Sequence, residues 1–169
     1  MRIFLIGYMG CGKSRWGKLI ADHYGYRFID LDTLIEEREM TSIPELFEQA
    51  GESGFREKEQ QALHSIAEQE NIIVATGGGA PCFNDNMEMI NRLGISLHIE
   101  ESPELLRDRI IESKTERPLV KNLSQDNLLQ YIRRHLQNRL PFYEQAQYKI
   151  VSGNLELNDF LQILDEHIL

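Results

Sequence analysis

An apolar run followed at once by a glycine-rich segment limits how this chain can begin to fold. Residues 3–6 read IFLI, and residues 7–14 read GYMGCGKS. The short apolar run is typical of a buried strand, whereas the apolar side chains that follow the glycines have helical spacing. The sequence therefore predicts a strand, a tight loop and a helix. In such a unit the positive end of the helix meets the loop, so that an anion can bind there.

The glycine-rich segment fits the phosphate-binding pattern G-x-x-x-x-G-K-[ST], known as the P-loop. Its backbone N–H groups and the following helix can surround a chain of phosphates. A lysine there supplies positive charge to the outer phosphates, and a serine hydroxyl is a ligand that Mg²⁺ accepts. The predicted nucleotide contacts from this loop are Gly10, Cys11, Gly12, Lys13, Ser14 and Arg15.

Short apolar runs recur along the chain with helical patterns between them, which predicts an α/β fold with a parallel sheet between layers of helices. A helix should begin at Ser42, which forms a capping box with Glu45, and a second long helix should follow residues 51–54. We expect five buried strands, at residues 3–6, 26–31, 72–76, 95–99 and 148–151.

Composition narrows the class of protein further. The 169 residues suit one domain, 1–169, and the net charge of −9 argues against a general nucleic-acid or membrane-surface role. No apolar stretch is long enough to cross a membrane. Two cysteines, Cys11 and Cys82, are too few for a disulfide framework, and we expect Cys11 to fill space rather than react. A cytoplasmic monomer is the expected form.

Two carboxylates follow the second expected strand, in the segment FIDLDTLIE. Asp30 and Asp32 would lie at the carboxyl end of that strand, where ligands bind in open α/β sheets. One of them could hold Mg²⁺, and the other could accept the proton of a hydroxyl group or orient it. The alternative is that both are solvated and that Asp32 caps the next helix.

Two further segments carry candidate residues for an acceptor site, and a third is a candidate lid. Arg56 lies in GFREKE, and Gly77, Gly78 and Gly79 follow the third expected strand, where glycines allow a ligand to approach the backbone closely. The alternatives are a plain turn for the three glycines and a surface ion pair for Arg56. Residues 112–127 are polar and without periodicity, which predicts a mobile lid.

The set GYMGCGKS, DLD, FREKE, GGGA, ERPL and NRLPFYEQA closely resembles shikimate kinase over nearly the whole chain. The resemblance implies a five-stranded parallel sheet in the order 2-3-1-4-5. It also implies ATP-dependent phosphorylation of the 3-hydroxyl of shikimate, a step of aromatic amino acid biosynthesis. A gluconate-type kinase would share the P-loop but lack three of these segments. A nucleotide-binding module without turnover would not need this set of charged residues.

The resemblance also assigns roles to residues. Asp30 would join Ser14 in holding Mg²⁺, and Asp32 would bind the hydroxyls of shikimate. The chain departs from the family in the segment that contacts adenine, where it has VSGNLELND at 151–159. The remaining implied roles are the shikimate carboxylate for Arg56 and Arg139, the shikimate ring for Gly77, Gly78 and Gly79, adenine for Arg109, and the lid over ATP for Arg117.

Overall fold

The computed structural model describes residues 1–113, 120, 123–153 and 155–168. Strands and helices alternate, as the pattern of apolar runs predicts. The elements are β1 (Arg2–Ile6), α1 (Lys13–Tyr24), β2 (Arg27–Asp30), α2 (Leu31–Glu39), α3 (Ile43–Ser65), β3 (Ile72–Ala75), the short 3-10 helix η1 (Ala80–Cys82), α4 (Asn86–Leu93), β4 (Ile95–Glu100), α5 (Pro103–Glu112), α6 (Gln125–Tyr143), β5 (Tyr148–Val151) and α7 (Leu157–Ile168).

The five strands form one parallel sheet in the order β2-β3-β1-β4-β5. This confirms the five expected strands and the order implied by the resemblance. Strand β1 lies at the centre, with Ile3 opposite Ile73 on β3 and Ile95 on β4. The expectation that all five strands are buried is wrong for β2 and β5. Both are edge strands, with a neighbour on one side only, and Arg27 and Val151 are exposed.

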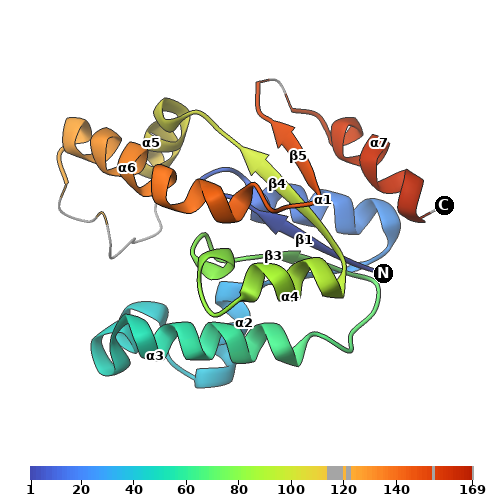
Figure 1. Ribbon diagram of the computed structural model, residues 1–169, viewed down its shortest axis with the longest axis horizontal. Helices are drawn as coiled ribbons and strands as arrows, with labels where there is room; N and C mark the ends of the chain where they lie inside the picture. The colour runs from blue at the N-terminus through green and yellow to red at the C-terminus, as the bar shows by residue number, and fades with distance from the viewer. Residues whose placement is uncertain (114–119, 121–122, 154, 169) are drawn as a thin grey trace.

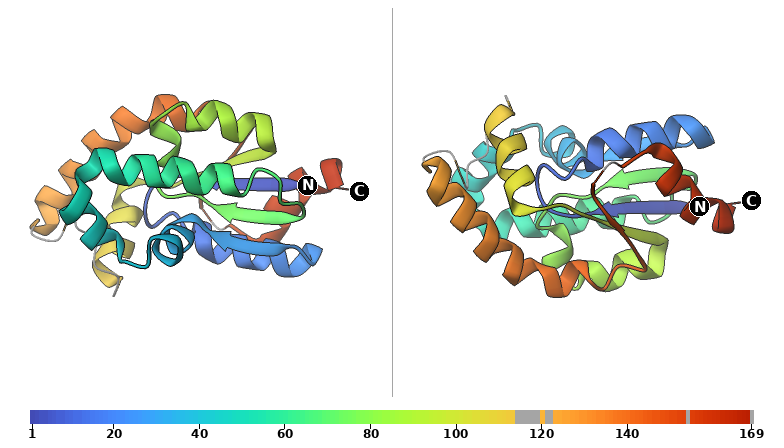
Figure 2. Two further views of the ribbon diagram at one scale, coloured as in Figure 1. Left: turned by 90° about the horizontal axis from the view of Figure 1, so that it is seen from below. Right: turned by 90° about the horizontal axis from the view of Figure 1, so that it is seen from above.

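Helices cover both faces of the sheet. Figures 1 and 2 show α1 and α7 on one face and α4 and α6 on the other, while α2 and α3 lie together beyond the β2 edge. All strands run in the same direction, so their carboxyl ends meet at one end of the sheet. The loops that follow β1, β2 and β3 therefore converge there, as expected for a binding site in an open α/β sheet.

Helix α3 begins where the sequence predicts. The Ser42 side chain accepts the N–H of Glu45, and the Glu45 side chain accepts the N–H of Ser42, which confirms the capping box. The helix is kinked at Gly51, whose φ of 67° lies in the left-handed region that favours glycine. The second expected helix is the continuation of α3 beyond this kink.

The expected lid overlaps two helices at its ends. Helix α5 extends to Glu112, and α6 begins at Gln125 after the Ser124 cap, so the outer residues of the range 112–127 are helical. Residues 114–119 and 121–122 lie outside the described residues. The predicted lid residue Arg117 is one of them.

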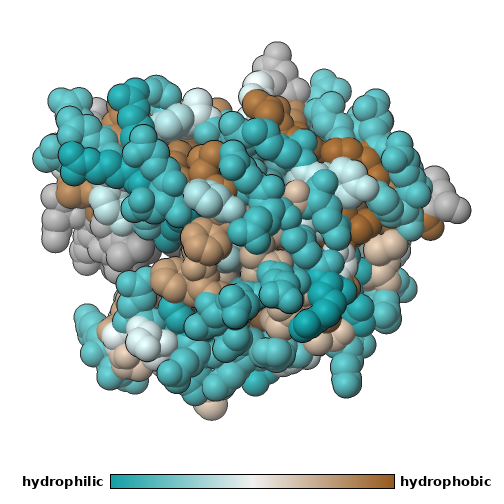
Figure 3. Space-filling view, in the orientation of Figure 1, coloured by the Kyte–Doolittle hydropathy of each residue, from teal (hydrophilic) through white to brown (hydrophobic). Residues whose placement is uncertain are grey.

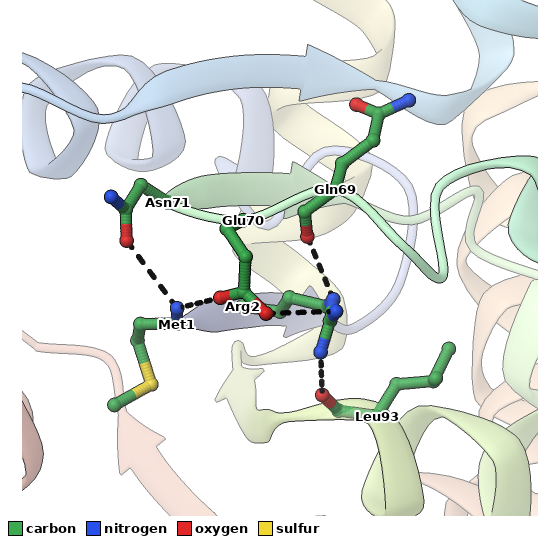
Figure 4. A network of polar contacts seen from close by, with 6 residues as sticks. All are labelled: Met1, Arg2, Gln69, Glu70, Asn71 and Leu93. Atoms are coloured by element: carbon green, nitrogen blue, oxygen red, sulfur yellow. Dashed lines mark hydrogen bonds and ion pairs between the residues drawn. The ribbon is translucent and has the colours of Figure 1, made fainter.

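The amino end of β1 is held by a polar network that Figure 4 shows from close by. The Arg2 guanidinium donates to the carbonyl oxygens of Gln69 at 2.7 Å and Leu93 at 3.2 Å, and to the Glu70 carboxylate at 3.0 Å. One side chain thus joins the loop before β3 to the end of α4. This network lies at the opposite end of β1 from the glycine-rich loop.

The surface of the molecule is mainly polar. In the orientation of Figure 3, hydrophilic residues cover most of the visible face, and apolar residues form small separate areas. No helix among the described residues is long and apolar enough to cross a membrane.

Candidate active site

The glycine-rich loop joins β1 to the first turn of α1, as predicted. Gly12 caps the helix with φ of 98°, a backbone conformation that residues with a Cβ rarely adopt. No side chain caps this helix end among the described residues. The backbone N–H groups of the first turn can therefore donate to a phosphate, and the helix dipole favours negative charge at that position.

Lys13 is held by its own loop. Its Nζ atom donates to the carbonyl oxygens of Gly7 at 2.7 Å and Tyr8 at 2.9 Å, and only 8% of the residue is exposed. The side chain lines the first cavity described below, but it is mostly buried because the loop carbonyls surround the ammonium group. The loop thus keeps a positive charge beside the phosphate-binding backbone.

A cavity of about 610 Å³ opens beside this loop at the carboxyl ends of the strands. It brings together residues that are far apart in the sequence and that were predicted to share a site. Its wall contains Gly10, Gly12, Lys13, Ser14, Arg15, Asp30, Asp32, Arg56, Gly77, Gly78, Gly79 and Arg139, together with the unpredicted Glu59.

Asp30 joins the second strand to the loop. Its Oδ2 atom accepts the Ser14 hydroxyl at 2.6 Å, and its Oδ1 atom accepts the N–H groups of Asp32 and Thr33. Asp30 therefore caps α2, and the alternative in which Asp32 is the cap is wrong, because the helix already begins at Leu31. A hydroxyl and a carboxylate side by side are oxygen ligands of the kind that Mg²⁺ prefers.

Asp32 points toward the glycine triplet. A Cβ on Gly77 would lie 2.8 Å from Asp32 Oδ1, so the missing side chain leaves room for this carboxylate. Burial raises the pKa of Asp32, and the negative charge of Asp30 raises it further. A carboxylate with a raised pKa is a stronger base, which suits a group that accepts a proton from a hydroxyl.

Arg56 is buried in the wall of the cavity, with 6% of the residue exposed. Its guanidinium donates to Glu59 at 2.8 Å and to Glu52 at 3.1 Å, and it lies over the ring of Phe83 at 4.2 Å. A Cβ on Gly79 would come within 2.5 Å of the guanidinium. The arginine therefore occupies the space above Gly79. The alternative of a surface ion pair does not apply to it.

Arg139 lies on α6 and forms part of the wall of the same cavity; it is also 6% exposed. Its guanidinium lies over the ring of Tyr8 at 5.5 Å, beside Gly78. The Nη1 atom is buried and has no hydrogen-bond partner among the described residues. Tyr143, one turn further along α6, donates to the carbonyl oxygen of Gly78 at 2.5 Å and thereby fixes the helix against the triplet. An unpartnered buried donor of this kind suits an anionic ligand.

A second cavity of about 370 Å³ shares Gly10, Gly12 and Arg15 with the first. Trp16 and Arg109 line it, so the predicted adenine residue is next to the loop. The unusual segment 151–159 contributes to its wall through Ser152, Gly153 and Leu155, and Glu101 completes the lining; Asn154 lies outside the part of the chain that the structure describes.

The family model described as shikimate kinase matches residues 9–167. The chain belongs to the shikimate kinase family. A shikimate kinase of Bacteroides thetaiotaomicron is 47% identical over 156 residues, which cover 92% of this chain and 89% of that protein. A shikimate kinase of Phocaeicola vulgatus is 46% identical over 155 residues, with coverage of 92% and 89%. The chain is therefore a kinase.

Solved structures of shikimate kinases have the same fold. The crystal structure of shikimate kinase from Bacteroides thetaiotaomicron matches with a TM-score of 0.90 and 44% identity, covering 98% of this chain and 97% of that chain. Shikimate kinase from Acinetobacter baumannii in complex with shikimate matches with a TM-score of 0.88 and 33% identity, covering 99% and 95%. These matches confirm the P-loop kinase fold.

The sequence analysis did not identify Glu59, which is a buried acid in the wall of the first cavity. The residue is 1% exposed, and its Oε1 atom has no hydrogen-bond partner among the described residues. Burial raises the pKa of Glu59 to about 7, although the Arg56 guanidinium acts in the opposite direction. The Glu59 carboxylate accepts a hydrogen bond from the Arg56 guanidinium and so holds the arginine in place. Its spacing of three residues from Arg56 on a helix was the available signal.

We expect Glu59 to make the stability of the fold depend on pH. In the folded state the pKa of the Glu59 carboxyl group is raised above its ordinary value of 4.5. The bound proton therefore stabilises the fold fully below pH 4.5, and this stabilisation is lost as the pH rises through 7. Relative to Glu59→Gln, the wild-type free energy of unfolding should fall across this range by on the order of 2–3 kcal/mol.

Urea unfolding of both proteins at a series of pH values measures this difference. Glu57→Gln removes an exposed carboxylate from the same helix and should keep the wild-type dependence on pH. A constant difference between wild type and Glu59→Gln from pH 4.5 to pH 7 would show that the pKa of Glu59 is not raised.

Proposed function

We propose that this kinase transfers the γ-phosphoryl group of ATP to the 3-hydroxyl of shikimate. The observation that carries the proposal is the cavity itself: two buried arginines, Arg56 and Arg139, lie in the same wall as Asp32 and next to the P-loop. Shikimate is a small ring with one carboxylate and three hydroxyls. Guanidinium groups bind carboxylates in a bidentate manner, and a carboxylate such as Asp32 binds hydroxyls.

The P-loop would hold the nucleotide. The N–H groups of Gly10, Cys11 and Gly12 would donate to phosphate oxygens, and Lys13 would leave its carbonyl partners to bind the transferred group. The second cavity, which Arg109 lines, would take the adenine, with Arg15 between the two cavities. Arg117 would approach the phosphates from the lid, a role that remains a prediction from the sequence.

Mg²⁺ would be held by Ser14 and Asp30 together with phosphate oxygens and water. Among the described residues, no group of three or more His, Cys, Asp and Glu side chains could hold a metal ion. Mg²⁺ in kinases usually takes one or two protein oxygens and the substrate phosphates, and the pair at 2.6 Å fits that need. When bound, the ion neutralises charge on the phosphates.

The chemical step needs a nucleophile and a base. The 3-hydroxyl oxygen of shikimate would attack the γ-phosphorus while the bond from that phosphorus to the bridging oxygen of ADP breaks, and ADP leaves with the electron pair. Asp32 would accept the hydroxyl proton, which its raised pKa favours. Gly77, Gly78 and Gly79 would allow the ring to lie close to the backbone.

ADP release in a coupled assay tests the proposal. The purified protein is supplied with ATP and Mg²⁺ and with shikimate, gluconate or no acceptor. We expect rapid ADP release with shikimate alone, and shikimate 3-phosphate as the product. Equal rates with gluconate, or equal rates without any acceptor, would contradict the proposed substrate.

Arg56→Ala and Arg139→Ala should each raise the shikimate KM about ten- to a hundredfold and leave the ATP KM nearly unchanged, because each removes a charge-assisted contact to the carboxylate. The double variant should lose less than the sum of the single losses, since both arginines bind one group. Initial rates over both substrate concentrations give these constants.

The matched control is Arg133→Ala, which removes an exposed arginine from the same helix as Arg139. It should behave as wild type in both KM values. If Arg56→Ala and Arg139→Ala keep the wild-type shikimate KM, the two arginines have a structural role only.

We also propose that the enzyme acts as a cytoplasmic monomer, in a step that leads to aromatic amino acids. Both cysteines are free, with Cys11 buried within the loop and Cys82 half-buried, which is consistent with a reducing compartment. The acidic composition gives no support for binding to nucleic acid or to membranes.

A further inference from the structure

Glu101 is an acid buried where no predicted role required one. It lies in the short connection between β4 and α5, and only 2% of its side chain is exposed. A buried carboxylate loses its hydration, and this cost is offset only when a cation and hydrogen bonds compensate it. Its partner is Arg109, whose Nη1 atom lies 2.9 Å from Glu101 Oε1.

Arg109 connects this acid to the P-loop. The same Nη1 atom donates to the carbonyl oxygen of Gly10 at 3.0 Å. One guanidinium nitrogen thus meets two acceptors, one on the loop and one on the connection before α5. A rigid planar group held by two acceptors from different segments has a fixed orientation, whereas a free arginine side chain has many rotamers.

The held guanidinium forms part of the wall of the second cavity. Trp16, Leu155 and Gly153 form other parts, and no ion pair other than Glu101 with Arg109 lines it among the described residues. The first cavity instead contains Asp32, Arg56, Glu59 and Arg139. A nucleotide with its phosphates on the loop can extend into either cavity, and the second offers a flat base the Trp16 ring and the Arg109 guanidinium. Guanidinium planes stack well on aromatic rings.

We propose that Glu101 is a positioning residue for the nucleobase: it holds the plane of Arg109 against the Gly10 carbonyl so that a purine can stack on it. This inference rests on the proposed function, since it assumes that the second cavity takes the base of ATP. Glu101 itself acts through Arg109. The Arg109 side chain is 38% exposed even in this ion pair, so without the acid it would be free to turn into solvent.

Glu101→Gln tests the proposal because it removes the charge and nearly keeps the shape. The ATP KM, and the ATP dissociation constant from calorimetry, should rise about three- to tenfold, while kcat and the shikimate KM stay within about twofold. The matched control is Glu104→Gln. Glu104 lies three residues after Glu101 and is an exposed acid that pairs with Arg133. This control should match wild type in all four constants.

A double-mutant cycle separates positioning from a merely structural role. Arg109→Ala alone should raise the ATP KM at least as much as Glu101→Gln, and adding Glu101→Gln to Arg109→Ala should change nothing further. Thermal melting of each variant shows whether it is folded. If Glu101→Gln unfolds at the assay temperature, Glu101→Asp takes its place, and an unchanged ATP KM for a folded variant overturns the proposal.

Two other results would overturn the inference: additive losses in the cycle, or equal increases in the ATP and shikimate KM values. An Arg109→Ala variant with the wild-type ATP KM would also do so, because Glu101 would then have nothing to position. Failure of the proposed function looks different. Wild-type protein would release no ADP with shikimate, and the ATP dissociation constants from calorimetry would still decide the role of Glu101.

Discussion

Replacing Lys13 with alanine is expected to reduce phosphoryl transfer to shikimate on the order of 10²–10³-fold. The lysine holds a positive charge against the loop backbone, and negative charge on the transferring phosphoryl group is greatest during the reaction. Because Nζ now binds the carbonyl oxygens of Gly7 and Tyr8, its loss also removes two hydrogen bonds from the loop. The measurement is kcat with saturating ATP and shikimate.

The loop contacts of Lys13 make a control necessary. Lys18→Ala removes an exposed lysine from the same helix and should keep wild-type kcat. Circular dichroism and thermal melting establish that Lys13→Ala is folded. If the folded variant keeps even about a tenth of the wild-type kcat, Lys13 does not supply the charge stabilisation that the P-loop mechanism requires.

The substitutions Asp30→Asn and Asp32→Asn should affect the activity in two different ways. Asp32→Asn removes the proposed proton acceptor and should lower kcat roughly 10²–10⁴-fold at every Mg²⁺ concentration. Asp30→Asn keeps the helix cap, because an amide oxygen can still accept the N–H groups of Asp32 and Thr33. It weakens the site beside Ser14, so more Mg²⁺ should be needed for half-maximal activity.

A Mg²⁺ titration of wild type and both variants separates the two carboxylates. The control is Glu37→Gln, which neutralises an exposed acid on α2 and should leave the titration unchanged. Excess Mg²⁺ should restore much of the activity of Asp30→Asn and none of that of Asp32→Asn. The reverse pattern would exchange the two roles.

The sequence was most informative where short-range rules apply. Apolar runs located the strands, and the capping box located the start of α3, because both depend on neighbouring residues. The order of the strands cannot be worked out from apolar runs alone, since several orders bury the same side chains; the family resemblance supplied it. Burial of β2 and β5 was overestimated for the same reason: an edge strand and a central strand can have similar sequences.

In the candidate site, the residues with strong local signals were brought together as predicted, whereas those that depend on packing were not foreseen. Glu59 is one of several glutamates on α3, and apart from its spacing of three residues from Arg56 nothing in the sequence predicts that it, rather than Glu57, is buried. Only the way in which α3 packs buries one and exposes the other. Glu101 is similar: Glu100 precedes it, and the two acids differ in burial because the chain leaves the sheet between them.

The glycine triplet limits how sequences of this kind can diverge. The absence of side chains at Gly77 and Gly79 leaves space that Asp32, Glu59 and Arg56 occupy. Alanine at position 79 would press on the Arg56 guanidinium, which also contacts Phe83 and Glu59, so the arginine would have to shift relative to both of them. A change from glycine to alanine is usually counted as conservative, but here it would displace the charged side chains that line the cavity. The effect of a substitution at position 79 should therefore depend on which side chain stands at position 56.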